Sequence, residues 1–188
     1  ALACLRAGGS HLIVESFAAP PALLLCGAGH IGYALARLAT PLRFRVLVVD
    51  DRPQFASRER FPEADQVIAA PFTEAIASVS LTERDAVVVA TRGHKEDHGA
   101  LLAAVGTRAG YVGLVGSRRK WALISRALRG AGVPTERAAQ VRCPAGLDIG
   151  ARTPEEIALS ILAEILMVRR GRDGRPLSTE PRGALSSA

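Results

Sequence analysis

The sequence predicts a single α/β domain built on a doubly wound parallel sheet, and three observations support that fold class. The pattern G-x-G-x-x-G directly follows an apolar run over 22–26. A second apolar run, over 45–50, comes after an intervening helical pattern and ends in an acid. Further apolar runs then alternate with helical patterns down to residue 170. This arrangement is typical of a Rossmann-type βαβ unit that opens a parallel sheet.

The three glycines of the pattern have separate roles in such a turn. Gly27 allows the tight turn, Gly29 lets a phosphate approach the backbone, and Gly32 lets the helix pack on the sheet. The free N–H groups and the positive dipole end of that helix then favour an anion. The alternative is that the glycines serve turn and packing alone, in a fold that has lost its nucleotide.

The alternation of elements defines the organisation of the chain. Strands are predicted at 22–26, 45–50, 65–69, 85–90, 110–115 and, with a weaker signal, 139–143. Helices are predicted at 30–40, 73–80, 94–106, 117–130 and 154–170. We divide the chain into a leader over 1–20 with one strand at 10–17, a domain over 21–170, and a flexible tail over 171–188.

The last predicted helix is apolar on almost every side. Thr153 and Glu156 supply a capping box at its start. Its polar stripe consists of Glu156, Ser160 and Glu164 alone. Such a helix is buried on most sides, in the core or in a subunit contact. We therefore predict a homodimer with the helix over 154–170 near the contact.

Ligands of a doubly wound sheet bind at the carboxyl ends of the strands, where the strand order reverses. With the order 3-2-1-4-5, that crevice lies between the first and the fourth predicted strand. The loop after the first strand should face the loop after the fourth. The predicted binding residues are Gly27, Gly29, His30, Gly32, Asp50, Asp51, Thr91, Arg92, Gly93 and His94.

Asp50 ends the second predicted strand, where an acid accepts hydrogen bonds from ribose hydroxyls. A carboxylate there disfavours a 2′-phosphate, so an NAD-like or simple nucleoside ligand is favoured over an NADP-like one. Arg52 follows closely and weakens that inference.

Two histidines share one face of the predicted helix over 94–106. His94 and His98 are four residues apart, with Asp97 beside them. This spacing suits a metal ion or a general acid–base pair. The other interpretation is that His94 starts the helix and His98 lies on its surface. We predict no metal site. We also predict no catalytic residue, because no Ser/His/Asp or Cys/His set is evident.

Two further loops carry candidate groups. Ser117, Arg118 and Arg119 form a possible anion clamp after the fifth predicted strand, or else the solvated start of an amphipathic helix. Asp148 is a ligand group or a loop-bracing acceptor, and bracing is favoured. Cys143 is the cysteine that we consider for sulfur chemistry.

Composition excludes several classes of protein. The chain has 188 residues, of which 48% are hydrophobic, but no apolar run reaches the length of a membrane span. The net charge is +6, and about half of the excess lies in the tail, which argues against a nucleic-acid surface. The 3 cysteines form no C-x-x-C pair, so a reducing cytoplasm is expected.

The same segments resemble the xanthine dehydrogenase accessory factor family (XdhC/CoxI), in its C-terminal Rossmann domain. The similar segments are GAGHIGYALARLA (27–39), VVDDRPQFASRERFPEADQVI (48–68), VVVATRGHKEDHGAL (87–101), YVGLVGSRRKWALI (111–124) and PAGLDIGARTPEEIALSILAEIL (144–166). Longer members of the family carry a further domain upstream, and the leader over 1–20 would be its end.

The resemblance implies a maturation factor in place of an enzyme. Members of the family bind molybdenum cofactor, which is a phosphorylated pterin, and protect it during sulfuration. They then pass it to a client hydroxylase such as xanthine or carbon monoxide dehydrogenase. A cysteine desulfurase is a further implied partner. From the residues alone, an NAD-dependent oxidoreductase and a nucleotide-sensing regulatory domain remain alternatives.

Overall fold

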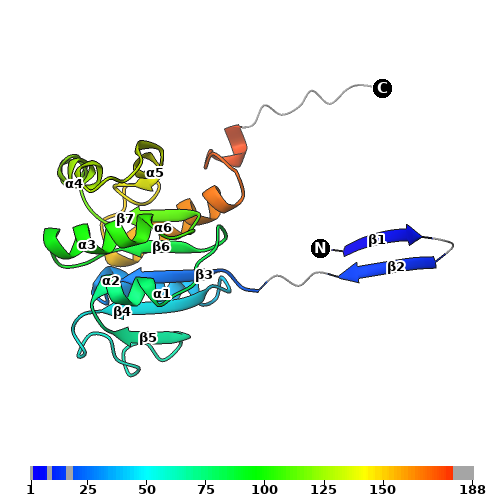
Figure 1. Ribbon diagram of the computed structural model, residues 1–188, viewed down its shortest axis with the longest axis horizontal. Helices are drawn as coiled ribbons and strands as arrows, with labels where there is room; N and C mark the ends of the chain where they lie inside the picture. Colours follow the sequence, from blue (N-terminus) through cyan, green and yellow to red (C-terminus); the bar gives the residue numbers. More distant parts are fainter. Residues whose placement is uncertain (1, 8–9, 16–18, 180–188) are drawn as a thin grey trace.

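The central sheet has six parallel strands, which confirms the predicted fold class. The computed structural model describes residues 2–7, 10–15 and 19–179. The strands of this sheet are β3 (Ala22–Cys26), β4 (Arg45–Asp50), β5 (Gln66–Ala69), β6 (Ala86–Val89), β7 (Tyr111–Leu114) and β8 (Val141–Arg142). Their order is β5-β4-β3-β6-β7-β8, so it reverses between β3 and β6, as predicted (Figure 1).

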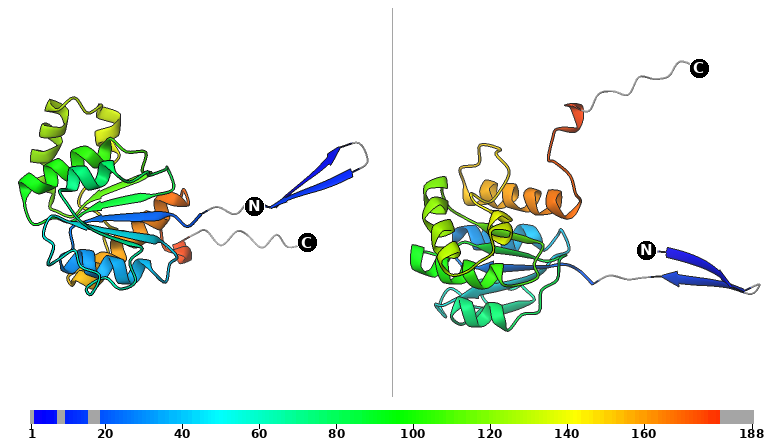
Figure 2. Two further views of the ribbon diagram at one scale, coloured as in Figure 1. Left: turned by 60° about the horizontal axis from the view of Figure 1, so that its bottom comes forward. Right: turned by 45° about the horizontal axis from the view of Figure 1, so that its top comes forward.

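Helices cover both faces of the sheet (Figure 2). One face carries α1 (His30–Ala39) and α6 (Pro154–Arg169), which contact each other. The other face carries α2 (Phe72–Ala77), α3 (His94–Val105), α4 (Arg118–Gly130) and the short α5 (Thr135–Ala139). The five predicted helices end within three residues of their predicted bounds, and α5 is an addition.

The central strands are buried along their whole length because both faces are covered. Successive side chains of a strand point to opposite faces of the sheet. In β3, Leu24 accordingly packs in the core on the α2–α4 side, and Leu23 and Leu25 pack in the core on the α1–α6 side. A continuous apolar strand is therefore what this position requires.

Two of the three polar residues in the stripe of α6 are buried, whereas Glu156 is exposed. Ser160 and Glu164 are 4% and 7% exposed. Glu164 accepts hydrogen bonds from the Tyr111 hydroxyl at 2.7 Å and from the Gly146 N–H at 2.8 Å. Burial, with the charge of Glu164, raises the pKa of Tyr111 above its usual value. The stripe thus holds the loop that precedes α6. On another side of the helix, Leu159 is 55% exposed.

The predicted homodimer has a direct test in this helix. Light scattering at micromolar concentration is expected to give a dimer mass, because an exposed leucine on an apolar helix favours a partner surface. Leu159→Glu is expected to shift the mass to the monomer. Leu177→Glu is the matched control, because Leu177 is exposed but lies outside α6. A monomer mass for the unmodified chain would contradict the prediction.

The two ends of the chain differ from the expectations in detail. The predicted leader strand is β2 (Ser10–Glu15), and it pairs antiparallel with β1 (Leu2–Ala7) in a separate two-stranded sheet. In the predicted tail, Leu177–Thr179 forms a short 3-10 helix. The rest of the tail, 180–188, lies outside the described residues.

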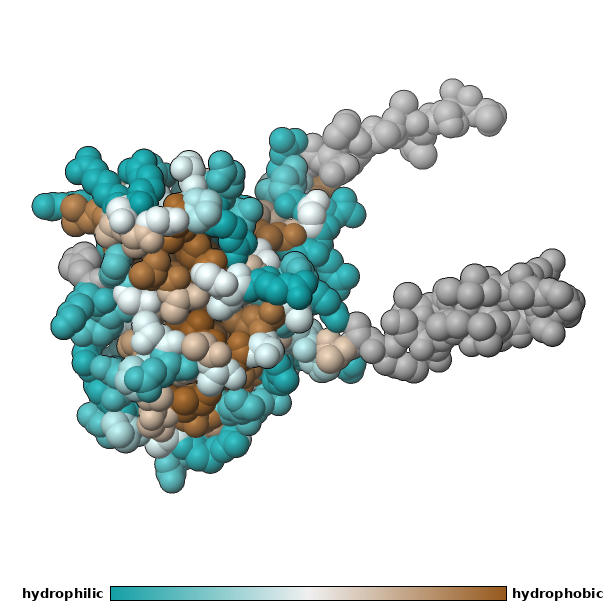
Figure 3. Space-filling model, viewed as in Figure 1, coloured by the Kyte–Doolittle hydropathy of each residue, from teal (hydrophilic) through white to brown (hydrophobic). Residues whose placement is uncertain are grey.

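No helix in the described part of the chain is long and apolar enough to cross a membrane. The face that carries α2 and α3 shows apolar side chains between polar ones (Figure 3). Part of this face is an apolar groove of about 430 Å³ between the ends of α2 and α3, lined by Ile76, Val79, Leu81 and Ala103.

Candidate functional site

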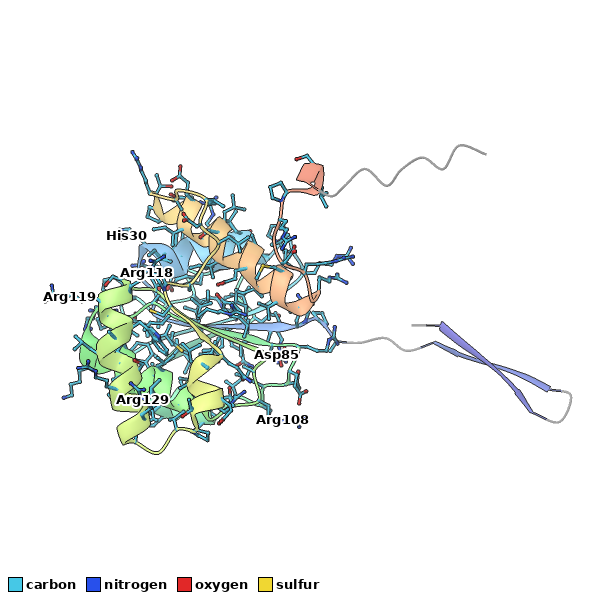
Figure 4. All side chains as sticks on the ribbon, turned by 90° about the horizontal axis from the view of Figure 1, so that it is seen from above. His30, Asp85, Arg108, Arg118, Arg119 and Arg129 are labelled. Carbon is cyan, nitrogen blue, oxygen red and sulfur yellow. The ribbon has the colours of Figure 1, made fainter. Side chains whose placement is uncertain are left out.

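The carboxyl end of the sheet gathers the charged side chains predicted for binding. Figure 4 shows His30, Arg118 and Arg119 at this end and Asp85 and Arg108 at the opposite end. Four helices, α1, α3, α4 and α6, begin at the carboxyl end. Their N-termini bring positive dipole ends to one edge, and those of α1 and α3 have no side-chain cap, which favours an anionic ligand.

The glycine loop between β3 and α1 is shaped by two glycines and left open at the third. Gly27 has a φ of +120°, and a Cβ there would overlap the carbonyl oxygen of Ala90. A Cβ at Gly32 would overlap the carbonyl oxygen of Gly27. Gly32 therefore lets α1 approach the glycine turn more than the sheet. A Cβ at Gly29 would meet no atom within 4 Å. The backbone at Gly29 is therefore accessible to a ligand.

Gly29 is also the N-cap of α1, and no side chain caps this helix end. The first-turn N–H groups of α1 therefore face the open side of the loop. Arg60 donates a hydrogen bond to the carbonyl oxygen of Ala28 at 3.2 Å and so supports the loop from the segment after β4. This fixed loop with open N–H groups is the arrangement that binds phosphate in α/β folds.

Asp50 ends β4 beside the glycine loop, and both of its carboxylate oxygens are already engaged. Oδ1 accepts from the N–H and Nε of Arg52 at 3.1 and 2.8 Å. Oδ2 accepts from Nη2 of Arg52 at 3.0 Å and from the N–H of Ala28 at 2.9 Å. The Arg52 guanidinium also lies 3.7 Å from the centroid of the Phe55 ring. A ribose contact by Asp50 therefore requires Arg52 to move, and it stays a prediction.

This pairing controls how Asp50 titrates. Burial alone would raise the pKa of Asp50, but hydrogen bonds from Arg52 and Ala28 and the charge of Arg52 outweigh burial and lower it. A carboxyl group whose pKa is lowered by folding stabilises the fold above its unfolded pKa, about 4. That stabilisation is lost as pH falls through the lower pKa of the folded state.

Asp50→Asn is expected to lower the free energy of unfolding by about 3 kcal/mol at pH 7, because Arg52 loses its buried partner. The difference from the unmodified protein should shrink between pH 4 and pH 2, where Asp50 itself becomes protonated. Urea unfolding of both proteins at pH 7 and at pH 2 measures this difference. Asp51→Asn, at the exposed neighbour, should cost less than about 1 kcal/mol. An equal effect of Asp50→Asn at pH 7 and pH 2 would contradict this account.

The loops after β4 and β6 meet across the end of β3, beside the predicted crevice. Arg92 Nη2 lies 2.9 Å from Asp51 Oδ2. The two side chains are 46% and 30% exposed, so the ion pair contributes about 0–1 kcal/mol and opens readily. Because β3 lies between β4 and β6, this pair crosses the crevice beside the glycine loop.

Thr91 and Asp97 form an internal brace. Asp97 is fully buried, accepts a hydrogen bond from the Thr91 hydroxyl at 2.7 Å, and forms an ion pair with Lys120. The brace joins the loop after β6 to α4. This brace has no signal in the sequence, because Asp97 and Lys120 are 23 residues apart and share no local pattern.

The predicted histidines and the predicted anion clamp lie on different elements. His30 and His94 begin α1 and α3 at the carboxyl end of the sheet. His98 is partly buried, and its Nε2 has no hydrogen-bond partner among the described residues, so the surface interpretation of His98 is wrong. Ser117 caps α4 by accepting from the Lys120 N–H at 3.2 Å.

Arg118 and Arg119 are exposed, and Arg118 alone of this pair lines a groove beside β7. We call this cavity the β7 groove. It has a volume of about 520 Å³, and its lining includes Gly116, Arg118, Pro144, Asp148, Ile149 and Ile157. Its size is that of pockets which hold small molecules.

The wall of the β7 groove is anchored through its backbone. The N–H groups of Ala145, Gly146 and Leu147 donate to the Leu114 carbonyl, Glu164 and the Ser160 carbonyl. Asp148, next in the chain, is exposed and makes no hydrogen bond or ion pair within the described residues. The predicted bracing role of Asp148 is therefore wrong, because the bracing acceptor is Glu164.

Cys143 precedes the groove loop and is half-buried. Burial raises its pKa to about 11, against a smaller lowering effect of Lys120. The thiol is therefore protonated at neutral pH, which disfavours nucleophilic sulfur chemistry. Burial likewise raises the pKa of Cys26, in β3, to about 12.

A parallel sheet with this strand order, an open glycine loop and a groove at its carboxyl end defines a Rossmann-type binding domain. Comparison with known proteins names the family. The family model for the "XdhC Rossmann domain" matches residues 23–165. The chain therefore belongs to the XdhC family, and the resemblance is confirmed.

Relatives of known sequence agree. The chain is 35% identical over 168 residues to the "uncharacterized protein YqeB" of Escherichia coli, and the match covers 89% of this chain and 31% of that one. It is 34% identical over 161 residues to a probable xanthine dehydrogenase subunit of Bacillus subtilis, over 86% and 47% of the two chains. The chain spans less than half the length of these relatives.

A solved structure shares the fold. The crystal structure of a protein described as a xanthine dehydrogenase from Bacillus halodurans matches with a TM-score of 0.70 and 26% identity. The match covers 91% of this chain and 47% of that chain.

Proposed function

We propose that this chain is the Rossmann-type part of a factor that binds molybdenum cofactor and inserts it into a molybdenum hydroxylase, such as xanthine or carbon monoxide dehydrogenase. The observation that carries the proposal is the open backbone at Gly29, at the uncapped N-terminus of α1. This site suits a phosphate, and the family membership supplies the link to a xanthine dehydrogenase-type client.

The residues present fit a phosphorylated pterin. Gly29 and the first N–H groups of α1 would hold the phosphate. The β7 groove lies two strands away, across β6, and combines charged groups with apolar side chains such as Ile149. When bound, the cofactor supplies the redox chemistry of the client enzyme, and this chain supplies binding and orientation.

The pairing of charged groups favours binding over turnover. Asp50 pairs with Arg52, Asp51 with Arg92, and buried Asp97 with Lys120. Asp50 and Asp97 are buried in their pairs, so they support loops and have no free position for proton transfer to a substrate. We therefore propose a cytoplasmic carrier protein, with the hydroxylase and a cysteine desulfurase as partners.

The experiment has two steps. The purified protein is denatured, and mass spectrometry of the released small molecules is expected to find a molybdopterin. The loaded protein is then mixed with the cofactor-free client hydroxylase, whose activity is expected to appear. A protein that carries no pterin and activates no client would overturn the proposal.

The spacing of the glycine pattern to Asp50 supports a second candidate, an NAD-dependent oxidoreductase or a nucleotide-sensing domain. Against it, Arg52 occupies the carboxylate that would receive the ribose. NADH fluorescence separates the candidates. Saturable quenching by the protein at micromolar NADH would favour this second candidate.

A further inference from the structure

The β7 groove presents an unpaired carboxylate to a cavity of about 520 Å³. We propose that Asp148 binds the 2-amino-4-oxopyrimidine edge that pterins and guanine share. The inference rests on the proposed function and adds the chemical group that the groove recognises. It also assigns a role to a side chain that braces nothing within the described residues.

The chemistry of Asp148 selects this edge. The lactam form of a 2-amino-4-oxopyrimidine carries two adjacent donors, the ring N–H and the exocyclic amino group. A carboxylate accepts two parallel hydrogen bonds, as it does from a guanidinium group. A ring with an oxygen in place of the amino group would instead turn a lone pair toward the carboxylate.

The rest of the groove suits a flat heterocycle. Pro144, Ile149 and Ile157 give apolar walls, and Ile149 is 53% exposed beside the cavity. Arg118 is exposed, is unpaired among the described residues, and lines the same cavity. Its guanidinium is suited to the 4-oxo group, which is an acceptor. Asp148 as acceptor and Arg118 as donor thus match the donors and the acceptor on one edge of the ring.

The backbone adds further donors. The N–H groups of residues 148–151 make no hydrogen bond within the described part of the chain. They follow the three anchored N–H groups of residues 145–147, so the groove loop changes from a supported half to an open half. The open half lies next to the N-terminus of α6, where a ligand acceptor is favoured.

The groove and Gly29 are placed to share one ligand. The carboxyl ends of β3 and β7 are separated by β6, which is two strand spacings, about 10 Å. A phosphate at Gly29 and a ring in the β7 groove therefore lie within the reach of a pterin with a short phosphorylated side chain.

The test compares ligands that differ in the 2-amino group alone. Pterin and lumazine, its 2-oxo analogue, are followed by their fluorescence, and GMP and IMP by calorimetry. We expect the protein to bind pterin about tenfold or more tightly than lumazine, since a charged hydrogen bond is lost. A matching preference for GMP over IMP would extend the ligand to guanine. Selectivity for pterin alone would restrict it to pterins.

Variants assign the preference to Asp148. Asp148→Asn should abolish the difference between pterin and lumazine, because an amide cannot accept both hydrogen bonds. Glu155→Gln is the matched control, since it removes an exposed carboxylate at the start of α6 outside the groove, and it should keep the difference. Unfolding midpoints should be unchanged in both variants, because both side chains are exposed.

Equal affinity for pterin and lumazine, a preference that survives Asp148→Asn, or no binding of either ring would overturn the inference. These outcomes are separate from the proposed function. A protein that carries molybdopterin but shows no Asp148-dependent preference loses this inference alone. A protein with the preference that carries no molybdopterin and activates no client loses the proposed function alone.

Discussion

Gly29→Asp is expected to abolish binding of the phosphorylated ligand while the fold stays intact. A Cβ at Gly29 meets no atom within 4 Å, so the side chain fits. Aspartate is also a better N-cap than glycine, which favours α1. The added carboxylate, however, would occupy the place of the phosphate and repel it. Calorimetry should show at least a hundredfold loss of affinity, with an unfolding midpoint equal to or above that of the unmodified protein.

Gly29→Asn is the matched control for this variant. It has nearly the same volume and also caps helices well, but it carries no charge. We expect an intermediate loss of affinity. The difference in affinity between the two variants measures the repulsion between the added carboxylate and the phosphate. Unchanged affinity in a folded Gly29→Asp variant would place the phosphate elsewhere.

Gly32→Ala is expected to destabilise the fold about as strongly as Asp50→Asn does at pH 7. The new Cβ would overlap the carbonyl oxygen of Gly27. That turn has no freedom to retreat, because the Gly27 N–H donates to the Val49 carbonyl at 2.8 Å and the Ala28 N–H donates to Asp50. We expect a loss of about 3 kcal/mol in the free energy of unfolding, measured by urea denaturation.

This result would run against helix propensity, which favours alanine over glycine by about 1 kcal/mol. Gly99→Ala in α3 isolates the propensity, because its Cβ would make only an ordinary contact with Thr73 at 3.8 Å. That variant should be as stable as the unmodified protein or more stable. If Gly32→Ala behaves like Gly99→Ala, the close approach of α1 to the glycine loop is not required.

Most of the fold could be predicted from the sequence because its signals are local. The glycine pattern, the continuous apolar strands and the capping box at Thr153 each specify an element within a few residues. The short α5 was missed because five residues carry no periodicity. The partner of the polar stripe of α6 could not be predicted, because periodicity shows that a face is polar but not what it packs against. Here Glu164 meets Tyr111, which is 53 residues away.

The candidate site was less predictable, because it depends on contacts between loops. The glycine loop and the facing loop after β6 follow from topology alone. The pairing of Asp50 with Arg52 was signalled only by their closeness in sequence. The free carboxylate of Asp148 had no sequence signal of its own. Two flanking glycines with positive φ, Gly146 and Gly150, are the hint that this loop is specially shaped.

The anchoring of the groove loop on Glu164 has a consequence for the order of events during synthesis. The ribosome makes the sheet and the glycine loop before it makes α6. Until α6 docks, the N–H groups of Gly146 and Leu147 lack their acceptors, Glu164 and the Ser160 carbonyl, and the loop is held at Ala145 by the Leu114 carbonyl. The glycine loop can therefore form on a nascent chain, whereas the groove loop waits for the last helix. The proposed site is in this way complete only in chains whose last helix has already docked.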